Sequence, residues 1–249
     1  MFLRKKPASK ILDWLYPSIC SLCECGLSEG KSLCNECASE LPRIVTPFCD
    51  ICSEPFDGQI DGDFDCPNCR RITFHFEFAR AAMDRSDGML GLVHGLKYGR
   101  QIHLARDLGA LSAEAFSDPR FAIALEEKWL LVPVPLHWIR KRQRHFNQAE
   151  EIARELSKKT GLPLADLLYR SRKTPTQTRL TRKQRMENLK DAFAVRKSWR
   201  KKNPATSKEV PGVILVDDVF TTGSTVDACA KVLRKAGVPR VAVLTAMRG

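Results

Sequence analysis

Near the carboxyl end of the chain, an apolar run is followed directly by two acids, a hydroxyl-rich loop and a helix. Residues 213–216 are apolar and mostly β-branched, which predicts a strand buried inside a parallel sheet. Asp217 and Asp218 end this run, and residues 226–235 have the pattern of a helix. Residues 241–246 predict a neighbouring strand. Elements in this order favour an α/β fold, in which helices flank a parallel sheet.

The loop between the acids and the helix has the composition of a phosphate site. Backbone N–H groups at the start of a helix attract anions, hydroxyls add donors, and glycine lets a ligand come close. Asp217 and Asp218 would repel a phosphate, but they can accept hydrogen bonds from a ribose diol and help hold a divalent ion. The segment lacks the Gly-x-x-x-x-Gly-Lys-Ser/Thr pattern of P-loop NTPases. It favours ribose 5-phosphate recognition over a surface turn with chance acids, through Thr221, Thr222, Gly223, Ser224 and Thr225.

Nine of the ten cysteines lie between residues 20 and 69, and eight of them form Cys-x-x-Cys pairs. The start of the chain lacks the apolar segment of a secretion signal, so we expect a cytoplasmic location, where clustered cysteines bind metal. Two pairs make one tetrahedral zinc site. Consecutive pairing gives two stacked ribbons, and interleaved pairing is the alternative. Four repeated pairs favour zinc over redox dithiols or an iron–sulfur cluster: Cys20/Cys23, Cys34/Cys37, Cys49/Cys52 and Cys66/Cys69.

A zinc ion held by four thiolates has no open position for a substrate, so we expect Zn²⁺ to be structural. It would supply folding energy that so short a segment cannot obtain from burial. This predicts a double zinc ribbon in residues 1–75, followed by a larger domain in residues 76–249. Because residues 1–80 carry 9 Lys and Arg against 12 Asp and Glu, the ribbon suits protein contacts better than phosphate binding. Cys229, outside the pairs, is interpreted as a small packing residue.

The middle of the chain alternates between helical and strand patterns. Helices are predicted at residues 87–99, 103–116 and 147–159, and glycines end the first and the last. Residues 129–136 predict a buried strand, and residues 137–145 predict a polar, basic loop after it. Basic groups at the carboxyl end of a parallel strand lie where α/β proteins bind ligands. A charged, solvated loop is the alternative interpretation.

Positive charge gathers in the second part of the chain. Residues 81–249 carry 32 Lys and Arg against 17 Asp and Glu, a net charge of +15 that favours anionic ligands. Residues 170–202 hold 13 of the basic residues, interspersed with hydroxyl and amide side chains. This mixture indicates a catalytic lid more than a nucleic-acid tail. No apolar run approaches the roughly 20 residues that cross a bilayer, so we expect no membrane insertion.

The segment 214–225 resembles the loop that binds 5-phosphoribosyl 1-pyrophosphate (PRPP) in type I phosphoribosyltransferases. Together with the cysteine pairs, it makes essentially the whole chain similar to the competence-associated ComF family (ComFC/GntX type). That resemblance implies a type I phosphoribosyltransferase fold behind a double zinc ribbon. One position departs from the family pattern, because His145 replaces a small residue and alters the expected shape of its loop. Further similar residues are Val132-Pro133-Val134-Pro135-Leu136-His137, Phe146-Asn147-Gln148-Ala149, Gln177, Leu180, Arg185, Asn188, Leu189 and Phe193.

The resemblance also implies roles for individual residues. Asp217 and Asp218 would hold the ribose hydroxyls, and the loop 221–225 would hold the 5′-phosphate. The segment at Leu136 and His137 would bind pyrophosphate, residues 172–188 would form a flexible lid, and Mg²⁺ would accompany PRPP. The candidate catalytic residues, which would stabilise the leaving pyrophosphate, are the lid arginines Arg179, Arg182 and Arg185.

Three functions are compatible with these features. The first, implied by the resemblance, is transfer of a phosphoribosyl group from PRPP to an unidentified acceptor. The second is a non-catalytic adaptor that binds single-stranded DNA or a helicase of DNA uptake in competence, with PRPP as a regulatory ligand. The third is a zinc-ribbon interaction protein. The chain shows no glutaminase segment, which argues against glutamine-dependent amide transfer, and its pattern indicates neither the acceptor nor the oligomeric state.

Overall fold

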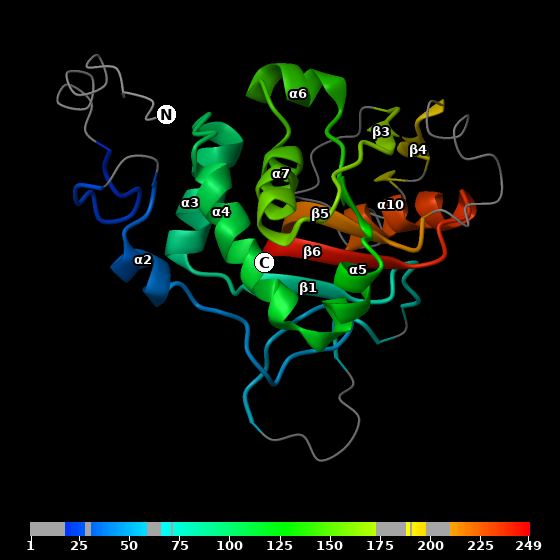
Figure 1. The fold of residues 1–249 in the computed structure, drawn as a ribbon, viewed down its shortest axis with the longest axis horizontal. Helices are drawn as coiled ribbons and strands as arrows, with labels where there is room; N and C mark the ends of the chain where they lie inside the picture. Colours follow the sequence, from blue (N-terminus) through cyan, green and yellow to red (C-terminus); the bar gives the residue numbers. More distant parts are fainter. Residues whose placement is uncertain are drawn as a thin grey trace, which may run out of the picture.

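The computed structural model describes residues 18–27, 31–58, 66–70, 72–172, 188–189, 191–197 and 210–249. Its centre is a four-stranded sheet in the order β1-β6-β5-β2, in which every neighbouring pair is parallel (Figure 1). The predicted α/β fold with a parallel sheet is confirmed. The strands are β1 (Ala79–Met83), β2 (Leu130–Pro133), β5 (Val213–Phe220) and β6 (Val241–Arg248).

Strand β5 is buried on both faces, as its continuous apolar run predicts. Successive side chains of a strand point to opposite faces. Ile214 and Val216 therefore pack into one hydrophobic cluster, and Val213 and Leu215 into another on the opposite face. The strand continues beyond the predicted segment 213–216 to Phe220. The two acids therefore lie in the second half of the strand rather than after it.

Helices cover both faces of this sheet. On one face lie α3 (Asp87–Tyr98), α4 (Leu104–Ala113) and α7 (Gln148–Thr160), which share a cluster with Ile214 and Val216. On the other face lies α10 (Ser224–Lys235), which packs with Val213, Leu215 and the hairpin formed by β3 (Leu168–Arg170) and β4 (Phe193–Val195). Figure 1 shows α3, α4 and α7 together at one side of the sheet and α10 at the other. The arrangement leaves a pocket at the carboxyl ends of β2 and β5.

The three helices predicted in the middle of the chain are confirmed as α3, α4 and α7. Ser86 caps α3 by accepting a hydrogen bond from the Met89 backbone N–H, and Gly99 follows its last residue. Gly161, with a φ of 71°, ends α7. Further short helices are α2 (Asn35–Glu40), η1 (Glu114–Ser117), η2 (Pro119–Phe121) and α5 (Ala122–Glu126). Within the part of the chain that the structure describes, every helix is too short or too polar to span a bilayer.

The loop predicted at residues 137–145 is wrong, because the segment forms the helix α6 (Trp138–Arg144). His137 caps its start, where the side-chain Nδ1 accepts a hydrogen bond from the Ile139 backbone N–H at 3.3 Å. His145, with a φ of 68°, ends the helix in the left-handed region. High charge obscured the helix in the sequence, since its polar residues show no apolar face.

The eight paired cysteines form two clusters, and in each the four sulfur atoms lie within 4.8 Å of one another. Consecutive pairs combine, which settles the pairing that spacing alone left open: Cys20, Cys23, Cys34 and Cys37 in the first cluster, and Cys49, Cys52, Cys66 and Cys69 in the second. Four thiols at this separation fit a tetrahedral zinc ion and leave no position for a substrate.

Both clusters pack against the rest of the molecule. The first lies on the face covered by α3, α4 and α7, where the Ser32 backbone N–H donates to Asp107 of α4 at 2.9 Å. The second is more deeply set: all four of its cysteines are buried in the hydrophobic cluster that contains Val213 and Leu215. Cys229 is fully buried there too, as a packing residue, whereas Cys25 is exposed. The division of the chain after residue 75 stays a prediction.

Loss of the second cluster should destabilise the protein more than loss of the first. Cys69 is buried among core residues, whereas Cys37 is half-buried and Cys23, in the same cluster, is exposed. We expect Cys69→Ser to lower the free energy of unfolding by at least about 4 kcal/mol, and Cys37→Ser by roughly half as much. Thermal unfolding, with zinc content measured by atomic absorption, tests this. Equal losses of stability would contradict it.

Candidate functional site

The carboxyl ends of β2 and β5 open into a pocket of about 360 Å³. Its lining comes from the end of α3, the segment after β2, α6, β3, and the end of β5 with its following loop. Parallel α/β sheets bind their ligands at this edge. Six charged side chains from four separate elements line the pocket: Lys97 of α3, Arg140 and Arg144 of α6, Arg170 of β3, and Asp217 and Asp218 of β5.

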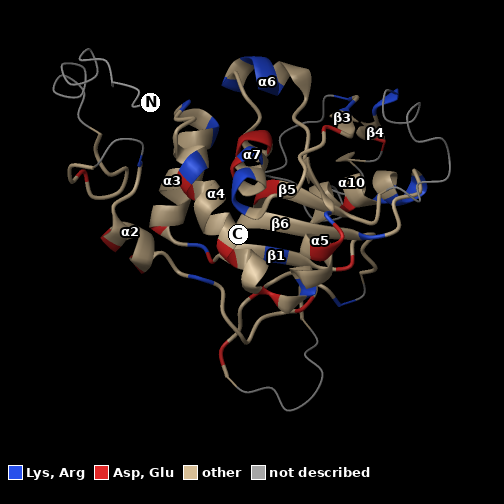
Figure 2. Ribbon diagram, viewed as in Figure 1, with Lys and Arg blue, Asp and Glu red and all other residues tan. Residues whose placement is uncertain are grey.

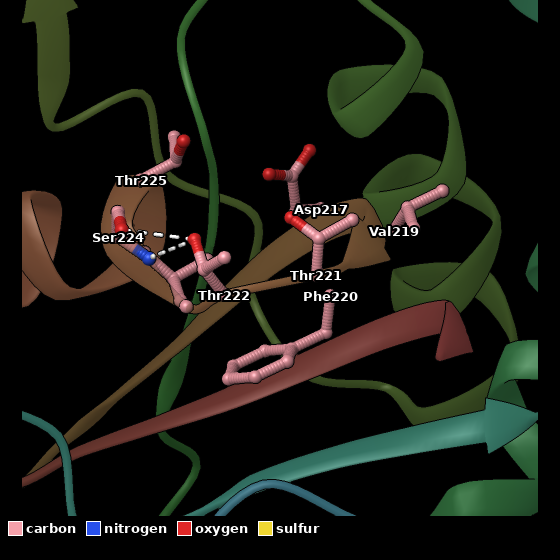
Figure 3. A pocket seen from close by; sticks show the side chains of 9 residues that line it. Asp217, Val219, Phe220, Thr221, Thr222, Ser224 and Thr225 are labelled. Carbon is pink, nitrogen blue, oxygen red and sulfur yellow. Dashed lines mark hydrogen bonds between the residues drawn. The ribbon is translucent and has the colours of Figure 1, made fainter. Parts of the chain in front are cut away.

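The loop after β5 wraps around a small hollow in front of helix α10. Asp217 and residues 219–226 line this hollow of about 20 Å³, which is room for about one water-sized group. The hydroxyls of Thr222 and Ser224 lie 2.9 Å apart. In Figure 3 the Phe220 ring points away from the Asp217 carboxylate. Helix α10 begins at Ser224, so its first N–H groups face the loop. The geometry is that of an anion cradle.

Gly223 is required at its position in this loop. Its φ of 75° lies in the left-handed region, which favours glycine. A Cβ atom added there would lie 2.7 Å from Cζ of Phe220 and 3.2 Å from Cε1 of Phe74. The rings of Phe220 and Phe74 therefore leave no room for a side chain at residue 223 and hold the backbone of the loop in place.

The two acids at the end of β5 lie close together. The Asp218 backbone N–H donates to Asp217 Oδ1 at 2.9 Å, and Lys97 Nζ lies 2.9 Å from Asp218 Oδ1. Burial, with the neighbouring Asp218 carboxylate, raises the pKa of Asp217 from its ordinary 3.8 to about 7. An acid pair that costs folding energy and lines a pocket is typical of a functional site.

Opposite the acids, arginines crowd together at the pocket. Burial lowers the pKa of Arg140, and Arg144 beside it adds to the effect. Burial likewise lowers the pKa of Arg170, and the nearness of Arg140 contributes next. Aromatic rings hold two of these guanidinium groups: Arg144 lies 5.0 Å from the Tyr98 ring centre, and Arg170 lies 5.2 Å from that of Phe193. Clustered, partly desolvated guanidinium groups favour a ligand with several negative charges.

The structure brings most of the predicted site residues together. Asp217, Asp218 and the loop residues Thr221, Thr222, Gly223, Ser224 and Thr225 line the pocket or the adjoining hollow, and Leu136 lines the pocket. His137 is buried as the cap of α6 and is not among the lining residues. The predicted lid arginines Arg179, Arg182 and Arg185 lie outside the described residues.

Sequence reasoning did not single out Lys97 and Arg170 as site residues. Lys97 lies at the end of α3 and Arg170 at the end of β3, and no local motif marks either of them. Arg140 and Arg144 belonged to a basic loop in the prediction, whereas α6 presents both to the pocket. Figure 2 shows basic residues on α6 and at the nearby end of α3. Only the folded chain brings these cations opposite the acids.

Asp217→Asn should stabilise the protein without ligand, and more so at high pH. A carboxyl whose pKa is raised by folding costs stability as the pH rises from about 4 to about 7, and the cost is complete above that range. Asparagine cannot ionise, so the variant should gain about 2 kcal/mol near pH 8 and much less near pH 5. Water in the open pocket keeps the gain below the roughly 4 kcal/mol of the full pKa difference.

Urea unfolding at both pH values measures this gain. Asp50→Asn, which removes a carboxylate that is 92% exposed, controls for the loss of one negative charge. A gain that is equal at the two pH values would contradict the interpretation.

Comparisons with known proteins agree with this geometry. A model of the double zinc ribbon domain matches residues 11–72, and a model of the phosphoribosyl transferase domain matches residues 146–249. Competence protein F of Haemophilus influenzae is 30% identical over 226 residues, which cover 90% of this chain and 94% of the relative. The DNA utilization protein YhgH of Escherichia coli is 29% identical over 91% of this chain and 95% of its own length.

A more distant relative shows the same extent of similarity. Competence protein ComFC of Bacillus subtilis is 24% identical over 241 residues, which cover 90% of this chain and 91% of the relative. The similarity thus extends over both matched domains and the region between them. The chain belongs to the ComF family, with a double zinc ribbon domain followed by a phosphoribosyltransferase domain.

Proposed function

We propose that this chain binds PRPP in the pocket at the carboxyl ends of β2 and β5 and transfers its phosphoribosyl group to an acceptor. One observation carries the proposal: a pocket lined by an acid pair and a cluster of arginines adjoins a hollow formed by a hydroxyl-rich loop at a helix N-terminus. PRPP offers the matching groups, namely a ribose diol, a 5′-phosphate and a pyrophosphate. The phosphoribosyl transferase domain match supports the same ligand.

Each part of the pocket takes one part of the ligand in this proposal. The loop 221–225 holds the 5′-phosphate through backbone N–H groups and hydroxyls. Asp217 and Asp218 accept hydrogen bonds from the ribose hydroxyls. The pyrophosphate lies against the segment at Leu136 and against the basic side chains, because its charge meets theirs: Lys97, Arg140, Arg144 and Arg170.

The proposed reaction is a displacement at C1 of the ribose. The bond from C1 to the pyrophosphate oxygen breaks, and its electron pair leaves with pyrophosphate. A lone pair of the acceptor forms the new bond to C1, and the acceptor releases its proton to water. Positive charge develops on the sugar, beside Asp217 and Asp218, while negative charge grows on the leaving group, beside the arginines. Arg179, Arg182 and Arg185 remain candidates for a lid that excludes water.

Mg²⁺ fits the proposed site, because oxygen atoms of carboxylates and phosphates are its preferred ligands. Asp217 and Asp218 would help hold it, together with the ligand's own oxygens. When bound, the ion would offset negative charge on the pyrophosphate. Lys97, which contacts Asp218, would remain next to it and add a further positive charge.

The variant Arg140→Gln should show how much the pyrophosphate group contributes to the affinity for PRPP. Arg140 lines the pocket, and loss of its charge-assisted contacts should weaken PRPP binding at least about tenfold. Ribose 5-phosphate lacks the pyrophosphate, so its affinity should stay within about twofold of the wild type. Titration calorimetry of both ligands, with Mg²⁺ present, measures the difference.

Arg142→Gln is the matched control for this experiment. Arg142 lies two residues further along α6 and is exposed outside the pocket, so its loss should leave both affinities unchanged. If Arg140→Gln weakens the two ligands equally, the assignment of the arginines to pyrophosphate is wrong. Pyrophosphate release on addition of candidate acceptors then tests turnover itself.

A second candidate function is an adaptor that binds single-stranded DNA, with PRPP as a regulatory ligand. One observation favours it: Trp138, at the start of α6, is 60% exposed beside the exposed basic residues Lys141 and Arg142. Exposed aromatic rings next to cations bind single strands by stacking and by phosphate contact. The names of the relatives, competence protein and DNA utilization protein, fit such a partner.

Trp138→Ala should weaken the binding of a thymidine oligonucleotide about tenfold if α6 forms this surface. Arg142→Gln should lower the slope of affinity against salt by about one, since it removes one phosphate contact. Fluorescence anisotropy of a labelled oligonucleotide measures both effects. Neither variant should change the affinity for PRPP, and unchanged DNA binding in both would exclude α6 as the surface.

A further inference from the structure

The phosphate loop is held from behind by an arginine at the end of the sheet. Arg248 is the last residue of β6 and is only 5% exposed. Its Nη1 donates to the carbonyl oxygens of Phe220 at 2.9 Å and Thr221 at 3.0 Å, and also to that of Gly249. The first two carbonyls belong to the peptide groups that begin the loop.

The second zinc ribbon supplies the partner of this arginine. Arg248 Nη2 forms an ion pair with the carboxylate of Glu54, which lies two residues after the zinc-site residue Cys52. A buried guanidinium needs such a partner, because a buried charge without one costs several kcal/mol. Glu54 therefore fixes the position of Arg248, and Arg248 in turn fixes two carbonyls of the loop.

A second contact ties the same ribbon to the loop. The chain leaves the ribbon after Cys69, and its Phe74 ring packs against Gly223. The next residue, His75, donates its backbone N–H to Asp227 in the first turn of α10 at 2.6 Å. The ribbon thus reaches the start of the loop through Arg248, and the segment after the ribbon contacts Gly223 and the first turn of α10.

Peptide geometry connects these contacts with the ligand. The carbonyl of one residue and the N–H of the next share a plane and point in opposite directions. When Arg248 holds the carbonyls of Phe220 and Thr221 behind the loop, it turns the N–H groups of Thr221 and Thr222 away from itself. These are the N–H groups that would face a phosphate.

We propose that Arg248 is a positioning residue for the phosphate loop and that Glu54 of the second zinc ribbon holds it in place. The ribbon then acts as a support for the ligand site as well as a folding element. The inference rests on the proposed function in one respect, namely that the loop 221–225 binds a phosphate.

The test compares Glu54→Ala with Glu54→Gln and with a matched control, Glu77→Ala. Glu77 forms an ion pair with Arg240 at 2.9 Å, and its side chain is 38% exposed against 36% for Glu54, but its partner does not contact the loop. Two quantities are measured on the zinc-loaded full chain: the affinity for ribose 5-phosphate, and hydrogen exchange of the loop amides 220–225 without ligand.

We expect Glu54→Ala to weaken ribose 5-phosphate about tenfold and to speed exchange of the loop amides to a similar degree. Glu54→Gln should restore part of both, because it keeps a polar oxygen beside the Arg248 guanidinium and loses only the charge. Glu77→Ala should change neither. Wild-type exchange and affinity in Glu54→Ala, or equal effects of Glu54→Ala and Glu77→Ala, would overturn the proposal.

Hydrogen exchange of the loop amides tests the support of the loop by Arg248 and Glu54 independently of ligand binding. If the wild type does not bind ribose 5-phosphate, the phosphate role of the loop is wrong. Faster exchange in Glu54→Ala alone would still show that the ribbon orders the loop, and unchanged exchange would overturn that as well.

Discussion

Two carboxylates at the end of a buried parallel strand repel each other, and much of the surrounding structure offsets that repulsion. Asp217 and Asp218 are held at the end of β5 because the strand is fixed by neighbours on both sides. Burial and the second acid raise the pKa of Asp217 to about 7, so the pair is costly to ionise. Lys97 from α3 contacts one acid, and a group of arginines lies across the pocket. These cations offset part of the cost of holding two carboxylates together at the end of β5.

The second zinc ribbon supports the same end of the sheet. Its four cysteines are buried in the cluster that contains the strand residues Val213 and Leu215. A zinc ion held there supports more than a separate small module, because the chain between and after its ligands contacts Arg248, Gly223 and α10. The first ribbon lies against α4 on the other face of the sheet and does not touch the loop through any of the described contacts. The two ribbons therefore have different consequences for the site.

The sequence allows the local parts of this structure to be predicted. The strand, the acids and the hydroxyl-rich loop are consecutive, so one segment specifies their geometry. The pairing of cysteines needed the fold, because spacing permits two combinations. Helix α6 was missed because its charged residues show no apolar periodicity. Strand β1 was missed because its residues are mostly alanine, with no β-branched side chain, and β3 and β4 because each has only three residues. Lys97 and Arg170 reach the pocket only through tertiary packing, for which neighbouring residues give no signal.

Binding of PRPP to the pair of acids is the central claim, and calorimetric titration tests it most directly. PRPP with Mg²⁺ is titrated into zinc-loaded protein and into the Asp217→Asn/Asp218→Asn variant, whose folding is verified by thermal unfolding. The account predicts binding by the wild type and a loss of at least about a hundredfold in affinity for the folded variant. No binding by the wild type, or equal binding by both proteins, would contradict it.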